Sequence, residues 1–408
     1  MTCKAWTLAA GLALGAAGHA CADIKLGYLD TLSGPTGGVG EATLTTFQLA
    51  VDRINAAGGV AGEPFALEVY DGKGKPDEVL VQFQKAIDDG VRHFLLANGS
   101  SLVAALVDAL NKYNARNPGE EALLINYGAS ATELTEENCS FWHFRFTPHA
   151  GMAVNALTDY VVKQGFGKVY VIGQDYVWGR NVADAAVSQL AEKAPGIEIV
   201  GNELHPVNKV KDFTPYVQKI ISAGADVVIT GNWGQDMTLL VKSAADSGAT
   251  MPFLTVFGGS IGTVAALGDA AVGQLYYVSE GNSNMEISAE QKALVDAYEA
   301  RFPDYDYTYH RNVLALKMLK AAIETAGSAD AIPVAKALEG MTFDDEFGPV
   351  EMRADDHQLL QNLYVNTVAK GLAYTADKTD LGWTLAEGGA VSKDRAALPT
   401  TCEMKRPE

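Results

Sequence analysis

The chain has 408 residues, of which 48% are hydrophobic and 20% charged, and this balance excludes a disordered or collagen-like protein. A chain of this length is expected to form two or three domains, each large enough to bury its own core. The 31 Lys and Arg face 50 Asp and Glu, and the formal charge of −19 argues against nucleic-acid binding, which needs clustered cations.

The first 22 residues have the pattern of a secretory signal peptide. They hold one cation, Lys4, no acidic residue, and an apolar stretch from Trp6 to about Ala17, followed by small residues before a cleavage point after Ala22. No later run reaches the roughly 18 apolar residues of a membrane helix, so we expect an exported, soluble protein of the periplasm. A lipid-modified Cys21 stays open as an alternative, although the preceding residues lack the leucine of a bacterial lipobox.

Cleavage after Ala22 leaves two cysteines, Cys139 and Cys402. In an oxidising compartment, two thiols predict one disulfide, which here ties the C-terminal tail to the region after Glu137. The alternative, two unrelated buried thiols, is less favoured because the polar tail around Cys402 has no core of its own.

Strands and helices alternate along the mature chain. The first unit is a strand at 24–29, a glycine-rich turn at 33–40 and a helix at 41–56. Further strands are expected at 65–70, 93–97, 123–126, 168–173, 197–204, 227–230 and 253–257, and helices at 76–88, 101–113, 179–194, 213–223 and 235–246. This alternation predicts an α/β fold with parallel sheets covered on both faces, and the two series of units predict two similar lobes.

The remaining chain predicts that the lobes are discontinuous. After the second series come a strand-like run at 274–278, helices at 289–301, 309–326 and 333–339, and two antiparallel-looking runs at 350–352 and 362–367. Helices left over after the second lobe indicate a return to the first. We therefore expect lobe 1 at 23–147 and about 280–345, lobe 2 at 148–279 and about 346–375, and a C-terminal tail at 376–408. No Pro- or Ser-rich linker is present, which favours a hinge of strands.

One motif raises a catalytic alternative. Residues 258–262 match the G-x-S-x-G nucleophile elbow around Ser260, after a predicted strand and before a helical run. Acids and histidines follow in the required order: Asp304 or Asp306 before His310, and Asp356 before His357. The spacings are short, and a glycine-rich turn at a strand end explains the motif more simply. A secreted serine hydrolase using Ser260 stays an alternative, but we do not expect an enzyme, and we assign no catalytic residue.

Cofactor and metal motifs are missing from the sequence. A G-x-G-x-x-G cannot be threaded through residues 34–40, because Thr43 stands where the last glycine belongs, and no Walker sequence exists. The histidines form no H-E-x-x-H and no zinc-type cluster with cysteine. We therefore expect neither a cofactor nor a metal.

Five predicted strand-to-helix junctions are rich in Ser, Thr, Gly and aromatic residues: 33–36, 98–101, 127–130, 176–179 and 231–234. Open parallel sheets bind ligands just beyond the carboxyl ends of their strands, and helix N-termini there favour an anion such as a carboxylate. Each Ser or Thr alone reads as a helix cap. Trp178 and Trp233 stand beside glycine at element starts, which is typical of the aromatic wall of a small-molecule pocket.

Several of these stretches together resemble one family. The matching pieces are 24–28 with 33–35, 55–62 followed by Asp71, 128–130 with 133–135, and 175–179. In their order and spacing the chain resembles the periplasmic solute-binding proteins of branched-chain amino acid ABC transporters, over essentially all of its mature length.

The resemblance implies a type I periplasmic binding protein, with two Rossmann-like lobes that are joined by three crossing strands and close around a ligand. It also implies membrane permease subunits as partners, whereas a ligand-sensing domain remains an alternative on the same fold. By resemblance, the loop with Ser100 and Ser101 holds the ligand carboxylate, and Gly128 and Ser130 contribute a carbonyl and a hydroxyl to the ligand ammonium. The aromatic rings of Trp178 and Trp233 would cover the ligand side chain.

The chain departs from this pattern at Phe257. In amino-acid-binding members an acidic residue just after the matching strand neutralises the ligand ammonium, and here Phe257 stands there. A buried ammonium without an anion costs several kcal/mol. Asp236 lies in the first turn of its predicted helix, where it suits the helix dipole. With Trp178, Trp233 and Phe257 as an apolar wall, the sequence slightly favours an aromatic or other apolar carboxylate over a zwitterionic amino acid.

Overall fold

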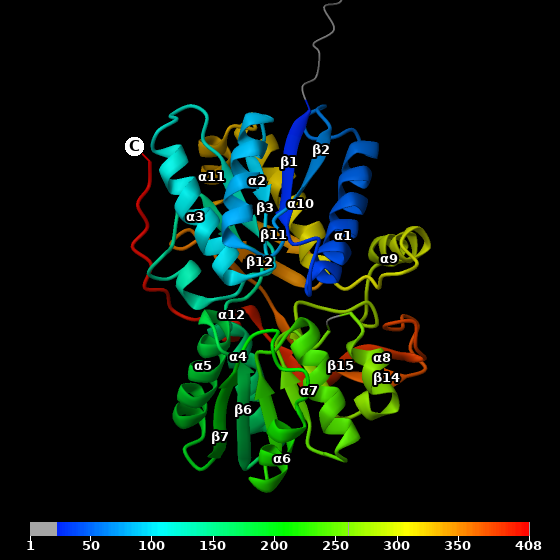
Figure 1. Ribbon diagram of the computed structural model, residues 1–408. Coiled ribbons are helices and arrows are strands. Elements are labelled where there is room, and N and C mark those ends of the chain that lie inside the picture. The colour runs from blue at the N-terminus through cyan, green and yellow to red at the C-terminus, as the bar shows by residue number, and fades with distance from the viewer. Residues whose placement is uncertain (1–22, 260, 408) are drawn as a thin grey trace, which may run out of the picture.

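The computed structural model describes residues 23–259 and 261–407, which form two lobes stacked one above the other (Figure 1). The predicted signal peptide and Cys21 lie outside the described residues. The upper lobe contains a parallel sheet in the order β2-β1-β3-β4-β5. Its strands are β1 (Ile24–Asp30), β2 (Phe65–Asp71), β3 (His93–Leu95), β4 (Leu123–Asn126) and β5 (His143–Arg145).

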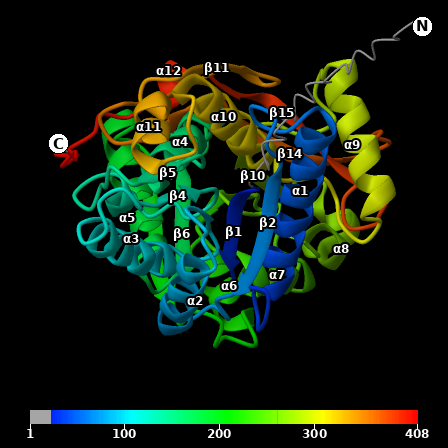
Figure 2. The same cartoon turned by 90° about the horizontal axis from the view of Figure 1, so that it is seen from above.

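Helices cover both faces of the upper sheet, as Figure 2 shows for α1 and α10 on one side and α2 and α3 on the other. The helices of this lobe are α1 (Gly37–Ala56), α2 (Pro76–Asp88), α3 (Ser100–Asn114), the 3-10 turn η1 (Thr132–Leu134), α9 (Ala289–Arg301), α10 (His310–Ala326) and α11 (Ala331–Leu338). Alternate strand residues point to opposite faces: Leu123 and Ile125 pack with α1 and α10, while Leu124 packs with α2 and α3.

The lower lobe is built on a seven-stranded sheet in the order β15-β14-β10-β9-β8-β6-β7. Its parallel strands are β6 (Lys168–Gln174), β7 (Glu198–His205), β8 (Val227–Thr230), β9 (Phe253–Thr255) and β10 (Leu275–Ser279). The antiparallel strands β14 (Leu363–Lys370) and β15 (Leu381–Val391) extend one edge. The helices are α4 (Ala150–Gln164), α5 (Val177–Lys193), α6 (Thr214–Ser222), α7 (Gly234–Asp246), α8 (Thr263–Leu267), the 3-10 turn η2 (Gly268–Ala271) and α12 (Lys393–Ala396).

Local sequence explains where several helices begin and end. Helix α2 starts with Pro76, whose missing N–H costs nothing at a first turn, and Asp77 and Glu78 follow where the helix dipole favours acids. Helix α4 ends at Gln164 and is capped by Gly165, which adopts the left-handed φ of 76°. None of the helices among the described residues is both long and apolar enough to cross a membrane.

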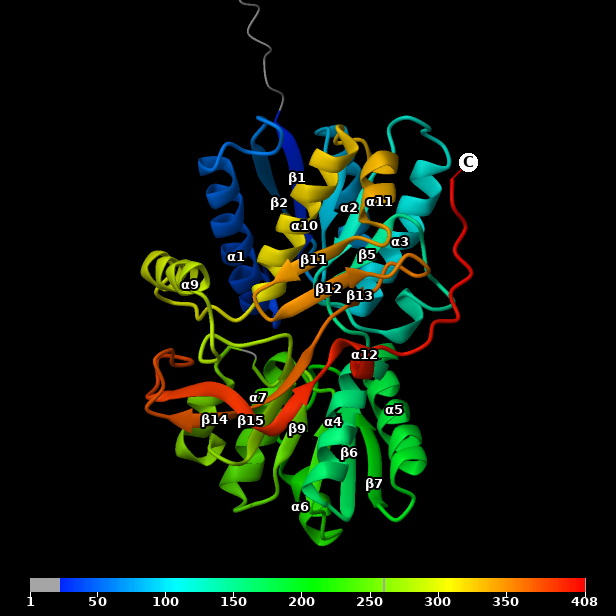
Figure 3. The ribbon, with the colours of Figure 1, turned by 180° about the vertical axis from the view of Figure 1, so that it is seen from behind.

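The predicted α/β fold with two lobes of parallel sheet is confirmed. The chain crosses between the lobes after β5, after β10, and between β13 and β14 (Figure 3). A small antiparallel sheet, β11 (Thr342–Asp345), β12 (Gly348–Met352) and β13 (Leu359–Leu360), lies at the base of the upper lobe. The two runs predicted at 350–352 and 362–367 therefore belong to different sheets, because the third crossing separates them.

The segment 376–408 was predicted as a tail, and this is wrong for its first part. Strand β15 pairs along β14 as the edge of the lower sheet. Its alternating Leu381 and Trp383 are buried, and the Trp383 ring lies against Tyr277 with the ring centroids 4.4 Å apart. This packing supplies the core contacts that make the segment a strand. The predicted return to lobe 2 at about residue 346 is also wrong, because Val350, Met352 and Leu359 of β12 and β13 pack into the core of the upper lobe. The remaining lobe boundaries stay a prediction.

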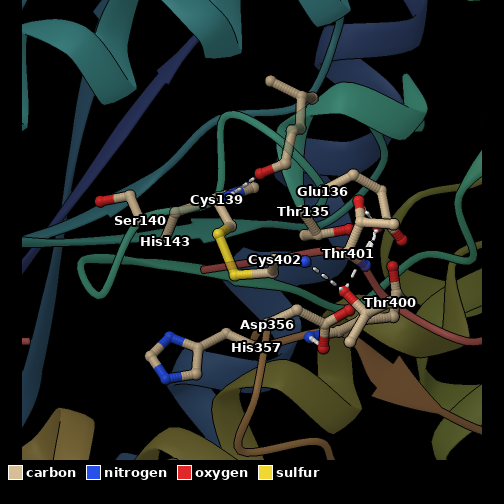
Figure 4. The surroundings of a disulfide bond; sticks show 12 residues. Thr135, Glu136, Cys139, Ser140, His143, Asp356, His357, Thr400, Thr401 and Cys402 are labelled. Carbon is tan, nitrogen blue, oxygen red and sulfur yellow. Dashed lines mark hydrogen bonds between the residues drawn. A yellow bond between two sulfur atoms is a disulfide. The ribbon is translucent and has the colours of Figure 1, made fainter. Parts of the chain in front are cut away.

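After α12 the chain leaves the lower lobe and runs up the side of the upper lobe, as Figure 3 shows. Cys402 forms a disulfide with Cys139 of the upper lobe, with a Cα–Cα distance of 5.9 Å (Figure 4). Next to it, the backbone N–H and the hydroxyl of Thr401 donate hydrogen bonds to Glu136 Oε2 at 2.5 and 2.7 Å. Helix α12 itself is held on the lower lobe, where Asn155 Nδ2 donates to the carbonyl of Arg395 at 2.7 Å. The C-terminal segment therefore straps one lobe to the other.

Candidate ligand-binding site

A cavity lies between the two lobes at the carboxyl ends of both parallel sheets; we call it the central cavity. Four of the five predicted junctions contribute to it, namely 98–101, 127–130, 176–179 and 231–234. The fifth, 33–36, lies outside its lining, and Val39 and Thr43 of α1 take that place. The central cavity therefore occupies the position that a sheet of this topology offers a ligand.

The upper wall presents the N-terminus of α3 to the central cavity. Helix α3 begins at Ser100, directly after Gly99, whose φ of 139° is open to glycine but rare for other residues. Ser100 Oγ accepts a hydrogen bond from the backbone N–H of Ala131 at 3.2 Å, and Ser130 Oγ donates to the Gly128 carbonyl at 3.1 Å. First-turn N–H groups have no partner within their helix, so this wall suits an anionic group.

Of the predicted upper-wall residues, Ser100, Gly128 and Ser130 line the central cavity, whereas Ser101 does not. Ser101 is exposed on the surface of α3. One step along a helix turns the side chain by about 100°, so a helix that directs Ser100 into the cavity directs Ser101 away from it. Its backbone N–H still belongs to the free first turn.

A buried network supports this wall from behind. Asp30, at the end of β1, accepts hydrogen bonds from the backbone N–H of Ala97 at 2.8 Å and of Asn98 at 3.2 Å, and from the Tyr127 hydroxyl. The Tyr127 hydroxyl oxygen also lies 3.0 Å from the Tyr28 hydroxyl. Burial raises the pKa of Asp30 to about 6, although these hydrogen bonds act in the opposite direction. The network fixes both cavity loops to the end of one strand.

The lower wall is aromatic. The Trp178 ring is almost fully buried, its Nε1 donates to the Gly231 carbonyl at 2.8 Å, and its centroid lies 5.1 Å from that of Phe257. The Trp233 Nε1 donates to the Tyr176 hydroxyl at 2.7 Å. Because both indole N–H groups are bonded within the lower lobe, these rings offer the cavity apolar surface. The structure brings all three predicted aromatic residues, Trp178, Trp233 and Phe257, into the lining.

Sequence reasoning missed two charged residues of the central cavity. Glu280 directly follows β10 and is 9% exposed, and Arg311 stands in the first turn of α10. Arg311 Nη1 lies 3.0 and 3.2 Å from the two carboxylate oxygens of Glu280, and Arg311 Nε donates to the Tyr127 carbonyl at 2.5 Å. The sequence did contain a signal for this pair. Arg311 is a cation at the N-terminus of a helix, where it opposes the helix dipole and is expected to need an acidic partner.

The other acid considered for the cavity, Asp236, has a structural place. It is 1% exposed, and its Oδ2 accepts hydrogen bonds from Gln174 Nε2 at 2.9 Å and from the backbone N–H of Asn208 at 2.8 Å. It lies outside the lining of the central cavity. Glu280 is therefore the carboxylate that the cavity contains among the described residues.

The two histidines of the catalytic alternative, His310 and His357, pair with other acids in the structure. Ser260 lies outside the described residues. His310 Nε2 pairs with Asp345 at 2.8 Å, and His357 Nε2 pairs with Glu339 at 3.0 Å. Neither histidine is paired with the acids considered from the sequence. Within residues 23–259 and 261–407, no group of three His, Cys, Asp or Glu side chains is arranged to hold a metal ion.

Comparisons with known proteins agree with this architecture. A family model described as periplasmic binding protein matches residues 23–373. Leu/Ile/Val-binding protein homolog 4 of Brucella abortus is 31% identical over 418 residues, which covers 100% of this chain and 97% of the relative. The leucine-, isoleucine-, valine-, threonine- and alanine-binding protein of Pseudomonas aeruginosa is 27% identical over 328 residues, covering 80% of this chain and 84% of the relative.

Solved structures extend the likeness. The closed form of a leucine-, isoleucine-, valine-, threonine- and alanine-binding protein from Brucella ovis superposes with a TM-score of 0.86 at 31% identity, covering 95% of this chain and 100% of that one. A solute-binding protein from Rhodopseudomonas palustris in complex with 3,4-dihydroxybenzoic acid gives a TM-score of 0.76 at 19% identity, with coverages of 91% and 98%. A branched-chain amino acid transporter substrate-binding protein from Streptococcus pneumoniae in complex with isoleucine gives a TM-score of 0.74 at 21% identity, covering 90% of this chain and 100% of that one. The last two show the shared fold alone.

Proposed function

The chain belongs to the periplasmic binding protein family, and on this basis we propose that it captures a small apolar carboxylate between its lobes for import. Members of this family are the solute-binding components of ABC transporters, and the relatives of this chain are of the branched-chain amino acid type. The family implies a periplasmic location. The ligand, its release to permease subunits and the absence of chemical turnover are our proposals.

The observation that carries the proposal is the two-sided lining of the central cavity. One wall offers the free N-terminus of α3 together with Ser100 and Ser130, which suit a carboxylate. The opposite wall offers the rings of Trp178 and Trp233, which suit an apolar group. A ligand with one carboxylate and an apolar body would touch both lobes, and contacts to both lobes favour the closed form.

The ligands named for similar proteins fall within this class. A relative is named for binding leucine, isoleucine, valine, threonine and alanine, and one structural neighbour holds a hydroxylated benzoic acid. Both groups of compounds carry a carboxylate, and they differ in the ammonium group. The sequence favoured the compounds without an ammonium, because Phe257 replaces the acid expected there. The structure, however, places the carboxylate of Glu280 in the same cavity.

A thermal-shift screen of amino acids and small organic acids tests the proposal. A ligand at about 100 times its Kd stabilises the folded protein by about 2.7 kcal/mol and raises its Tm. The radius of gyration from small-angle scattering should fall when the same compound is added. A screen in which no carboxylate raises Tm would contradict the proposal, and so would consumption of the compound that binds.

A further inference from the structure

The C-terminal segment passes from the lower lobe to the upper lobe through residues 397–402, which we call the strap. It starts after Ala396, whose side chain is fully buried in the lower core that contains α4 and α5. Arg395, one residue earlier, pairs with Asp159 of α4 at 2.5 Å. Figure 3 shows the strap on the side of the molecule away from α9. The strap is therefore a fourth link between the lobes, in addition to the three chain crossings.

The upper lobe holds the strap by hydrogen bonds and by one covalent bond. Arg353 Nη1, between β12 and β13, donates to the Leu398 carbonyl at 2.6 Å, and Glu136 accepts further hydrogen bonds from the strap. The disulfide between Cys402 and Cys139 closes the link (Figure 4). Each hydrogen bond contributes little net free energy, because water can replace it, whereas the disulfide persists when the lobes separate.

These attachments give the strap a short reach and a long reach. Leu398 is two residues from Ala396, and two residues span at most about 7 Å. Cys402 is six residues from Ala396, and six residues span at most about 22 Å. When Arg353 and Glu136 release the strap, the disulfide still limits the separation of the lobes to the longer reach. Without the disulfide, the strap sets no covalent limit.

The part of the upper lobe that receives the strap leads directly to the central cavity. The segment from Ser130, which lines the cavity, to Cys139 contains η1 and Glu136. Arg145 Nη1 donates to the Ala131 carbonyl at 2.6 Å, which fixes this segment to the end of β5, where the first crossing begins. A limit on the separation of the lobes at the strap therefore also limits how far the central cavity opens.

We propose that the strap is a tether that limits how far the two lobes open, and that the disulfide sets this limit. Both cysteines are half-buried, so a dithiol can reach the bond. Reduction adds two electrons and two protons to the S–S bond and gives two thiols, while the dithiol becomes a disulfide. The reduced protein then reaches wider open forms. A ligand that favours the closed form competes with these additional forms and binds more weakly.

Small-angle scattering of the unliganded mature protein tests the tether. The samples are the oxidised wild type, the wild type reduced with dithiothreitol, and the double variant Cys139→Ser with Cys402→Ser. We expect both samples without the disulfide to have a larger radius of gyration and maximum dimension than the oxidised wild type. Dithiothreitol should leave the double variant unchanged, because residues 23–259 and 261–407 contain no other cysteine.

A longer strap separates its reach from the loss of the bond. Insertion of Gly-Ser-Gly-Ser between Pro399 and Thr400 lengthens the strap and keeps the disulfide. It should enlarge the unliganded protein as removal of the bond does. The same insertion between Arg406 and Pro407 lies beyond the disulfide and is the matched control, which should behave as the oxidised wild type.

Ligand affinity gives a second measurement, with L-leucine and 3,4-dihydroxybenzoate as probes in titration calorimetry. Loss of the disulfide should raise the Kd of a probe that binds by at least about 5-fold. Saturation with that probe should bring all samples to the same radius of gyration, whereas damage to the fold would leave the variants enlarged.

Equal dimensions of the oxidised and reduced unliganded protein would overturn the tether, and so would a Kd that does not depend on the disulfide. Either result would leave the proposed function intact. A protein that binds neither probe nor any other carboxylate would contradict the proposed function, while the scattering of the unliganded samples would still decide on the tether.

Discussion

Asn181 of the lower lobe is bonded to Glu133 of the upper lobe, with 2.9 Å between Asn181 Nδ2 and Glu133 Oε1. The same side chain accepts a hydrogen bond from the backbone N–H of Thr132 at 2.9 Å through its Oδ1. Val177, one turn earlier on α5, packs against the upper core that contains α2 and α3. These contacts join the lobes directly, apart from the chain crossings, and they exist only while the lobes are together.

The variant Asn181→Ala should therefore weaken ligand binding without touching the ligand. Two hydrogen bonds contribute about 1–3 kcal/mol to the closed form, and a ligand that selects this form loses affinity accordingly, by about 5-fold to 150-fold. Calorimetry measures the affinity, and scattering should show a larger radius of gyration for the unliganded variant. Asn202→Ala, at an exposed position of β7, is the control. Equal affinities for the two variants would contradict a role in closure.

Two glycines of α1 offer a matched test of the packing beside the central cavity. A Cβ on Gly40 would lie 1.8 Å from the Thr31 carbonyl oxygen, whereas a Cβ on the exposed Gly38 would meet nothing within 4 Å. Gly40→Ala should lower the free energy of unfolding by several kcal/mol, because helix and strand must separate. Gly38→Ala should change it little or raise it by up to about 1 kcal/mol. Urea unfolding measures both, and similar losses in the two variants would be inconsistent with this close approach.

Residues 33–40 show which features a local sequence pattern can predict and which it cannot. The alternation of strands and helices was readable from the sequence because hydrophobic periodicity is a local property. The glycine-rich run 33–40 was predicted as a turn, but α1 already begins at Gly37. Gly40 serves the contact between α1 and the end of β1, which is a tertiary property that the helix pattern does not contain.

The candidate site likewise has one part that the sequence predicts and another part that it does not. Junction loops at strand ends were predictable, since the rule for parallel sheets places them together whatever their partners. The Glu280 and Arg311 pair was not, because the two residues are 31 positions apart and meet only when the chain returns to the upper lobe. Strand β15 was missed for a related reason. Its pairing partner, β14, begins only after the chain has crossed between the lobes for the third time, and Gly388 and Gly389 interrupt the alternation of apolar residues in β15.

Removing the disulfide should loosen the strap between the lobes. The bridge joins residues 263 positions apart, and loss of a native disulfide in small secreted domains typically costs about 2–5 kcal/mol. We expect a loss toward the lower end for the double variant Cys139→Ser with Cys402→Ser, because Thr400 and Thr401 remain bonded to Glu136. Chemical unfolding of wild type and variant, each with and without reductant, measures the difference. Free thiols at both positions in protein isolated from the periplasm would contradict the bridge.

Three buried histidines make the stability depend on pH. Burial lowers the pKa of His93 to about 4 and, together with the nearby Arg145, that of His143 to about 3, and burial also lowers the pKa of His149 well below its ordinary value. The unfolded chain takes up protons at these positions near pH 6.5, whereas the folded chain does so only at lower pH. Their contribution is therefore complete above pH 6.5 and is lost as the pH falls. Asp30 acts in the opposite direction between about pH 6 and 4, because its folded pKa is raised.

We therefore expect the free energy of unfolding to fall by on the order of 3 kcal/mol per pH unit between pH 6 and 5, because the three histidine protons outweigh the one at Asp30. His357 acts in the same direction as these histidines, since burial also lowers its pKa. Urea unfolding at pH 7.5, 6.5 and 5.5 measures the slope. In His149→Phe the slope should drop by about 1.4 kcal/mol per pH unit, because both ring nitrogens of His149 are buried without a hydrogen-bond partner and a phenyl ring does not titrate. A stability that stays level or rises on acidification, or a slope that is the same in His149→Phe as in the wild type, would show that these histidines are not held neutral by the fold.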